Sequence, residues 1–182
     1  MRHSLDKKIY IGTMSGTSYD GIDICSLNVA NKISLLKFSS FKYPTLLRED
    51  ISRAIQRQEL SLDRYFDLNR RIGQAFSKSI KKFLTQNKIN KKNVAAIGLS
   101  GQTLFHQPKS RYPFSIQAGD PIIIANECEI DVVSDFRNDH IKLGGEGAPL
   151  VPEFHQRLCA KRNTPLVILN IGGISSFTYL VG

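Results

Sequence analysis

The chain has 182 residues, of which 41% are hydrophobic and 23% are charged, and its formal net charge is +9. This length allows one domain, or one domain and the beginning of another, and the composition argues against a disordered, collagen-like or disulfide-stapled chain. The longest apolar runs fall far short of the roughly 20 residues that cross a bilayer, and no export signal follows the charged N-terminus, so we expect a cytoplasmic protein without a membrane partner.

The cysteines and histidines give no sign of a metal centre. Cys25, Cys128 and Cys159 are odd in number and far apart, and no C-x-x-C pair occurs. The four histidines also lack the paired spacing of zinc ligands. We therefore expect three reduced thiols and no structural zinc.

Residues 10–24 are the most informative segment. An apolar run leads into a turn rich in glycine and hydroxyl groups, and an alternating apolar run follows, which predicts a β-hairpin. Glycine lets backbone N–H groups approach an anion, hydroxyls add donors, and a carboxylate beside a polyphosphate suits Mg²⁺. The segment therefore predicts a phosphate site without a lysine, and the alternative is an ordinary glycine-rich turn; its polar residues are Thr13, Ser15, Thr17, Ser18 and Asp20.

The next elements in chain order are a third strand and two helices. Residues 33–43 predict a strand that ends at Pro44. A helix is expected from a Thr45 cap to about residue 58, and a longer one from Ser61 to about residue 87. The apolar positions of the longer helix are expected in the core: Leu62, Tyr65, Phe66, Leu68, Ile72, Phe76, Ile80 and Phe83.

The second half of the chain predicts shorter elements. We expect a buried strand at 94–99, a loop at 100–103, an ordered stretch at 116 and 121–127 that is mainly helical, a strand at 131–134, a polar glycine-rich loop at 135–149, a helix at 151–160 and two strands within 167–180. The last pair resembles the opening hairpin. The predicted division is a lobe of residues 1–162 and the first hairpin of a second lobe at 163–182.

Three polar clusters follow predicted strands, where open α/β sheets place their sites. They are Gly101 to His106, Asp135 to Arg137, and Gly144 to Pro149. Gln102 and Arg137 could hydrogen-bond the hydroxyls or carboxylate of a sugar. The alternative is that Asp135 and Arg137 only brace their loops.

Together these segments resemble the anhydro-N-acetylmuramic acid kinase family of the hexokinase, Hsp70 and actin superfamily. The matching stretches lie in family order across almost the whole chain: Gly-Thr-Met-Ser-Gly-Thr-Ser-Tyr-Asp-Gly-Ile-Asp (12–23), Gly-Gln-Thr-Leu-Phe-His-Gln-Pro (101–108), 117–121, Asp-Phe-Arg (135–137), Gly-Ala-Pro-Leu-Val-Pro-Glu-Phe-His-Gln (147–156) and Asn-Ile-Gly-Gly-Ile-Ser (170–175). The resemblance implies an α/β, ribonuclease-H-like lobe with a mixed sheet. It also implies an ATP-dependent sugar kinase that opens the 1,6-anhydro ring with water and phosphorylates O6, in cell-wall sugar recycling.

The resemblance also assigns residues. The ATP and Mg²⁺ side would comprise Gly16, Thr17, Ser18, Tyr19, Asp20, Gly21, Ile22 and Asp23, with Asp20 beside the metal. The anhydro-sugar side would comprise Gln102, His106, Gln117, Asp135, Arg137 and Asn170. This chain departs from the family pattern at Ser100, where a histidine is usual, at Glu146, where a glutamine is usual, and at Ser176, where an asparagine is usual.

Members of the family continue into a second lobe that carries the aspartate general base. No catalytic base is therefore expected within residues 1–182, and we expect a truncated form that is inactive, or one that is completed by a separate C-terminal lobe or a homodimer. The alternative function is a nucleic-acid-binding module that uses the basic helix 78–92. With few aromatic residues in that stretch, a solvated helix face is favoured over a nucleic-acid interface.

Overall fold

The computed structural model describes residues 9–29, 33–159, 164–171 and 175–181. The chain forms two compact units. The first unit comprises the chain up to His106 together with Ser115–Asp135, and the second comprises Gln107–Phe114 and Phe136–Gly182. The predicted boundary between residues 162 and 163 stays a prediction.

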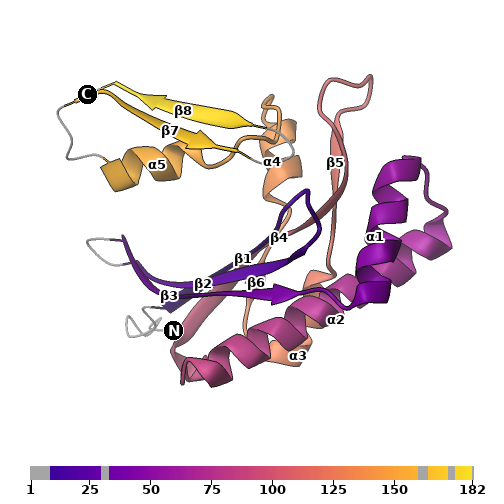
Figure 1. The fold of residues 1–182 in the computed structure, drawn as a ribbon, viewed down its shortest axis with the longest axis horizontal. Coiled ribbons are helices and arrows are strands. Elements are labelled where there is room, and N and C mark those ends of the chain that lie inside the picture. The colour runs from indigo at the N-terminus through magenta and orange to yellow at the C-terminus, as the bar shows by residue number, and fades with distance from the viewer. Residues whose placement is uncertain (1–8, 30–32, 160–163, 172–174, 182) are drawn as a thin grey trace. The chain divides into compact units, whose positions relative to one another are not determined.

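The first unit is built around one mixed sheet (Figure 1). Its elements are β1 (Ile9–Ser15), β2 (Gly21–Val29), β3 (Ile33–Lys42), α1 (Thr45–Arg57), α2 (Leu62–Gln86), the 3₁₀ turn η1 (Lys91–Asn93), β4 (Val94–Gln107), β5 (Phe114–Ala118), α3 (Pro121–Cys128) and β6 (Val132–Val133). The strand order is β3-β2-β1-β4-β5, and β6 pairs with β4. β1, β2 and β3 are antiparallel, whereas β4 is parallel to β1 and β6 is parallel to β4. The expected α/β class with a mixed sheet is confirmed, and its ribonuclease-H-like part stays a prediction.

Helix α2 supplies much of the core of this unit. Ile72, Phe76 and Ile80 recur at a spacing of four residues, which places them on one helix face, and all three are fully buried. They belong to the same apolar cluster as Ile11 and Ile24 of the sheet. Burial of each such side chain contributes about 1.5–3 kcal/mol to the stability of the fold, so this face holds the helix against the sheet.

Two residues expected in the core of α2 are exposed. Leu62 and Phe66 are 74% and 63% exposed. Each lies six residues before a buried position, Leu68 and Ile72 respectively, and six residues of an α-helix lead to a different face. The core expectation is therefore wrong for these two residues.

The helix caps differ from one another. The Ser61 side chain accepts a hydrogen bond from the Arg64 N–H and caps α2, as expected. For α1 the cap position is Pro44, which makes no side-chain cap hydrogen bond, and Thr45 is the first helical residue. The expectation of a Thr45 cap is therefore wrong, because Thr45 already lies in the helix and Pro44 takes the cap position.

The structure corrects three further expectations. The segment expected as a loop at 100–103 lies inside β4, and Ile116 lies in β5. Part of the expected loop at 135–149 is a helix, α4 (Phe136–Lys142). Cys25, Cys128 and Cys159 are free, as expected. Within the described residues no helix combines the length and apolar character needed to cross a lipid bilayer.

The second unit contains α4, α5 (Pro152–Cys159), β7 (Leu166–Asn170) and β8 (Ser176–Leu180). β7 and β8 form the expected antiparallel hairpin. Helix α5 contacts β8, and His155 Nδ1 lies 2.9 Å from the buried Thr178 hydroxyl. The hairpin is therefore tied to α5 within its own unit.

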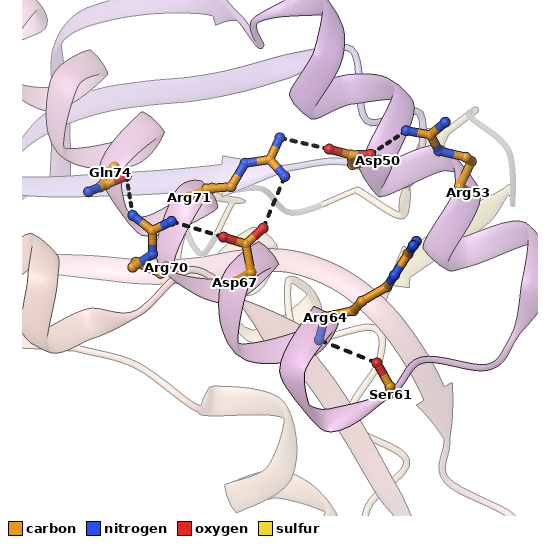
Figure 2. A network of polar contacts seen from close by, with 8 residues as sticks. All are labelled: Asp50, Arg53, Ser61, Arg64, Asp67, Arg70, Arg71 and Gln74. Carbon is orange, nitrogen blue, oxygen red and sulfur yellow. Dashed lines mark hydrogen bonds and ion pairs between the residues drawn. The ribbon is translucent and has the colours of Figure 1, made fainter.

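A chain of charged residues links α1 to α2 (Figure 2). Arg71 contacts Asp50 of α1 at 2.7 Å and Asp67 of its own helix at 3.2 Å. Arg53 also pairs with Asp50, and Arg70 pairs with Asp67 at 2.9 Å. Hydrogen bonds from Arg53 and then Arg71 lower the pKa of Asp50. Because Arg71 alone among these arginines joins the two helices, it is the one whose loss should weaken their packing.

We predict that Arg71→Gln lowers the free energy of unfolding by about 1 kcal/mol at pH 7, the upper range for partly exposed ion pairs. A carboxylate with a lowered pKa stabilises the fold above its unfolded pKa and loses that contribution as the pH falls. The difference from the parent chain should therefore shrink below about pH 4. Urea unfolding at pH 7 and pH 3 measures it.

Arg70→Gln is the matched control, because within the described residues the contacts of Arg70 are with Asp67 and Gln74 of its own helix. We expect it to cost less than half as much as Arg71→Gln. Equal costs for the two variants would show that the link between α1 and α2 has no role in stability.

Candidate functional site

The turn between β1 and β2, residues 16–20, is the first part of the candidate site. The Tyr19 N–H donates to the Gly16 carbonyl at 3.0 Å, and Tyr19 adopts a φ of 43°. The Ser18 hydroxyl donates to Asp20 Oδ1 at 2.9 Å. Thr17, Ser18 and Asp20 are exposed. Two hydroxyl groups and one carboxylate therefore face solvent at a tight bend, whereas Thr13 and Ser15, expected in the same polar site, are buried.

Other residues assigned to the turn have structural explanations. Ile22 is 1% exposed and lies in the core, so only its backbone is available to a ligand. A Cβ at Gly21 would lie 2.5 Å from the Phe41 carbonyl oxygen, so close packing against β3 requires glycine there. Asp23 accepts a hydrogen bond from Ser40 of β3. The exposed polar groups of the turn are thus fewer than the residues that the motif assigns to the ligand.

A one-residue bulge in β4 brings a polar side chain beneath this turn. In the parallel pairing of β1 and β4, Thr13 faces Leu99, but Ser15 faces Gln102, so β4 contains one extra residue. Gly101 lies in this extra segment with a φ of +68°, and a Cβ there would lie 2.8 Å from the Ala118 carbonyl oxygen. Glycine relieves both constraints, and the bulge turns Gln102 to the buried side.

Gln102 is completely buried, and both ends of its amide are hydrogen-bonded. Its Nε2 donates to the carbonyls of Gly16 and Thr103, at 3.2 Å each. Its Oε1 accepts from the Ser15 hydroxyl at 2.6 Å. The side chain expected to bind sugar therefore contacts the protein itself.

A second polar chain joins β4 and β5. Thr103 Oγ1 donates to Gln117 Oε1 at 2.8 Å, and Gln117 Nε2 donates to Ser115 Oγ at 2.7 Å. His106 Nδ1 lies 3.0 Å from the same Ser115 oxygen. Gln117 and His106 are thus brought together through Ser115, which sequence reasoning missed because its role depends on strand pairing.

Asp135 follows β6 and adopts a φ of 66°. Burial raises the pKa of Tyr65, and the charges of Asp120 and Asp135 raise it further. Tyr65 of α2, expected only as a core residue, is therefore electrostatically coupled to a predicted sugar-side carboxylate. No sequence signal marked it, because tyrosine at helical spacing is typical of a core position.

In the second unit Arg137 holds a loop. Its Nη1 donates to the Gly147 carbonyl at 2.9 Å, and the Gly147 N–H donates to His140 Nδ1 at 3.1 Å. Burial lowers the pKa of Arg137. Asn170 is exposed at the end of β7, and the Gly-Gly-Ile stretch after it lies outside the described residues. Arg137 therefore braces its loop.

The basic stretch 78–92 is partly neutralised. Lys81 pairs with Glu127 and Lys91 with Glu129, each at 2.7 Å. These acids reduce the local positive charge that a nucleic-acid interface would need. The nucleic-acid alternative stays a prediction, and the structure supplies no observation that favours it.

A hollow of about 840 Å³ lies between α1 and α2, and none of the predicted site residues is among the described residues that line it.

Among the described residues no group of three or more carboxylate, histidine or cysteine side chains is placed to hold a metal ion. A metal at the β1–β2 turn would depend on one carboxylate and on oxygens of the ligand, which is how Mg²⁺ commonly binds beside polyphosphates.

Comparison with known proteins identifies a family. The family model described as Anhydro-N-acetylmuramic acid kinase matches residues 8–182. An Anhydro-N-acetylmuramic acid kinase of Gamma-proteobacterium EBAC31A08 is 50% identical over 97% of this chain and 48% of its own length. Those of Actinobacillus pleuropneumoniae serotype 7 (strain AP76) and Shewanella loihica (strain ATCC BAA-1088 / PV-4) are 38% and 41% identical over 97% and 98% of this chain, and 48% of their own lengths.

The chain therefore spans about half the length of the curated relatives it matches. Among solved structures, the Thermus thermophilus RuvC structure aligns over 85% of this chain and 82% of its own, with 14% identity and a TM-score of 0.39. At that TM-score the likeness supports no conclusion about function.

We predict that Gly101→Ala destabilises the chain by about 3 kcal/mol, because a left-handed backbone costs about 1–2 kcal/mol outside glycine and the Cβ would also overlap the Ala118 carbonyl. Thermal or urea unfolding measures the loss. Gly16→Ala is the control, since its Cβ would meet Ser18 Oγ only at an ordinary 3.5 Å. A Gly101→Ala chain as stable as Gly16→Ala would contradict the constrained bulge.

Proposed function

Since the chain belongs to the anhydro-N-acetylmuramic acid kinase family, we propose that its β1–β2 turn binds the phosphates of ATP in the phosphorylation of an anhydro-sugar. In that reaction water adds across the 1,6-anhydro bridge, the γ-phosphoryl group passes to O6, and ADP leaves. The anhydro-sugar is the substrate, and ATP and Mg²⁺ are the cofactors.

The observation that carries this proposal is the direction of one peptide group. The Gly16 carbonyl accepts from both Gln102 Nε2 and the Tyr19 N–H, so it points into the protein. In a trans peptide the next N–H points the opposite way. The Thr17 N–H is therefore directed outward beside exposed hydroxyls, which is the geometry that phosphate oxygens require.

Asp20 fits a magnesium-associated role. Its carboxylate is exposed in the same turn and is held by the Ser18 hydroxyl. Mg²⁺ typically takes one or two protein carboxylates and completes its shell with phosphate oxygens and water. The ion would neutralise charge on the transferring phosphoryl group, while Thr17 and Ser18 orient it.

For the sugar we propose Gln117, His106 and Asp135 from the first unit. Gln117 and His106 offer donors and acceptors next to each other through Ser115, which suits vicinal hydroxyl groups. From the second unit we propose Arg137 and Asn170, each on the family resemblance alone.

We also propose that turnover requires residues that correspond to the rest of the relatives' length. The relatives matched here are about twice as long as the aligned part. Phosphoryl transfer depends on positioning the nucleophile and on closure that excludes water. The proposed partner supplies that other half of the fold, and a homodimer is the competing arrangement.

We predict that the 182-residue chain binds Mg-ATP and that Asp20→Asn weakens this binding at least tenfold in the presence of Mg²⁺ but less than threefold without it. The reason is that loss of the carboxylate removes a metal ligand and leaves the turn N–H groups in place. Isothermal titration calorimetry with and without Mg²⁺ measures both values.

Asp63→Asn in the first turn of α2 is the control, because it removes an equal charge outside the β1–β2 turn. Equal losses for the two variants would reduce the effect to net charge. For the kinase proposal, sugar-dependent ADP release should appear when the chain is mixed with the C-terminal half of the Gamma-proteobacterium relative. ADP release at the same rate with and without the sugar would contradict the kinase proposal.

A further inference from the structure

We propose that Gln102 is a positioning residue of the β1–β2 turn and that it is not a ligand of the sugar. This inference deepens the proposed function, and its nucleotide part rests on that function. Its structural part stands on the first unit alone, because Ser15, Gly16 and Thr103, the partners of Gln102 among the described residues, lie there.

The hydrogen-bonding capacity of Gln102 is almost exhausted. A primary amide offers two N–H donors and two acceptor lone pairs. Both donors are used, by the Gly16 and Thr103 carbonyls, and one lone pair accepts from Ser15. The remaining lone pair belongs to a side chain that is fully buried. A sugar hydroxyl could reach that lone pair only if the protein around Gln102 opened.

The orientation of the amide is also fixed. If its oxygen and nitrogen were exchanged, an acceptor would face the Gly16 and Thr103 carbonyl oxygens, which are themselves acceptors. Only the observed orientation pairs donors with acceptors. Gln102 therefore offers one stable arrangement.

Gln102 and Ser15 together hold both ends of the turn. Gln102 binds the Gly16 carbonyl at its start. The Ser15 hydroxyl lies 2.6 Å from Gln102 Oε1 and 2.9 Å from the Gly21 carbonyl at its end. Its single proton serves one acceptor at a time, so the two bonds are coupled. These hydrogen bonds on the buried side thus constrain both ends of the five-residue segment between Ser15 and Gly21.

This closure sets the direction of the Thr17 N–H. Because the Gly16 carbonyl is drawn inward by Gln102, the N–H of the same peptide group faces outward. Without Gln102 the Gly16 carbonyl would keep only the Tyr19 N–H, and the peptide could rotate. Pre-ordered donors bind an anion better than donors that must first be ordered.

The first test is amide hydrogen exchange of the full chain, measured by NMR as protection factors. The Tyr19 N–H reports the turn, and the Ile80 N–H in α2 reports global opening. Gln102→Leu should lower the Tyr19 protection factor at least tenfold more than that of Ile80. Gln117→Leu removes a glutamine that bonds Thr103 and Ser115 and makes no hydrogen bond with the turn in the part of the chain that the structure describes. It should change the Tyr19 protection factor less than twofold.

Gln102→Glu keeps the size of the side chain and makes the test independent of whether the leucine variant folds. As a carboxylate it has no donor, so Tyr19 protection should fall at pH 8. When protonated it regains one O–H donor, so protection should recover as the pH is lowered toward 5. A Tyr19 protection factor that matches the parent at every pH would overturn the positioning role.

The ligand arm uses calorimetry with Mg-ATP and with the 1,6-anhydro-sugar. We expect Gln102→Leu to weaken Mg-ATP binding at least tenfold and sugar binding less than twofold, and Gln117→Leu to show the reverse. Loss of sugar binding in Gln102→Leu with Mg-ATP binding intact would overturn the inference. If the parent binds neither ligand, the proposed function fails, and the protection factors still decide the role of Gln102.

Discussion

The parallel pairing of β1 with β4 is the constraint on which the candidate site depends. It brings Thr13 beside Gly98, whose carbonyl accepts the Thr13 hydroxyl at 3.1 Å, and it places Gln102 beneath the turn after β1. Parallel neighbours must come from distant parts of the chain, and here Ser15 and Gln102 are 87 residues apart. The apolar face of α2 keeps these strands together, so the polar site is only as rigid as the core below it.

Rigidity and exposure are divided sharply in this hairpin. Thr13 and Ser15 at the end of β1 are buried with hydrogen-bond partners, whereas Thr17, Ser18 and Asp20 are exposed a few residues later. Buried polar groups with partners fix the backbone, because leaving them unpaired costs free energy. The exposed groups are then carried on a fixed backbone, which is what the proposed electrostatic recognition of a phosphoryl group requires.

Elements set by local pattern were predictable, including the opening hairpin, the Ser61 cap and the β7–β8 pair. The expectation of a loop at Gly101 is wrong because a glycine can mark either a bulge or a strand end, and pairing with the neighbouring strands distinguishes the two. Helix α4 could not be predicted from apolar periodicity, because its residues are mostly polar and form no apolar stripe. The same division holds for the site. The exposure of the turn residues can be predicted from their composition, whereas the burial of Gln102 depends on a partner far along the chain.

Charge then explains how a turn without lysine or arginine could hold the proposed polyphosphate. Residues 13–23 carry two acidic side chains and no basic one, although the chain has a net charge of +9. The basic surface elsewhere raises the local concentration of anions, but its field is screened over roughly 10 Å at ordinary salt. In the proposed function, Asp20 would repel a bare nucleotide and attract one that carries Mg²⁺. The metal would then be part of what this turn binds, and the outward Thr17 N–H would select the phosphate geometry once the charge is balanced.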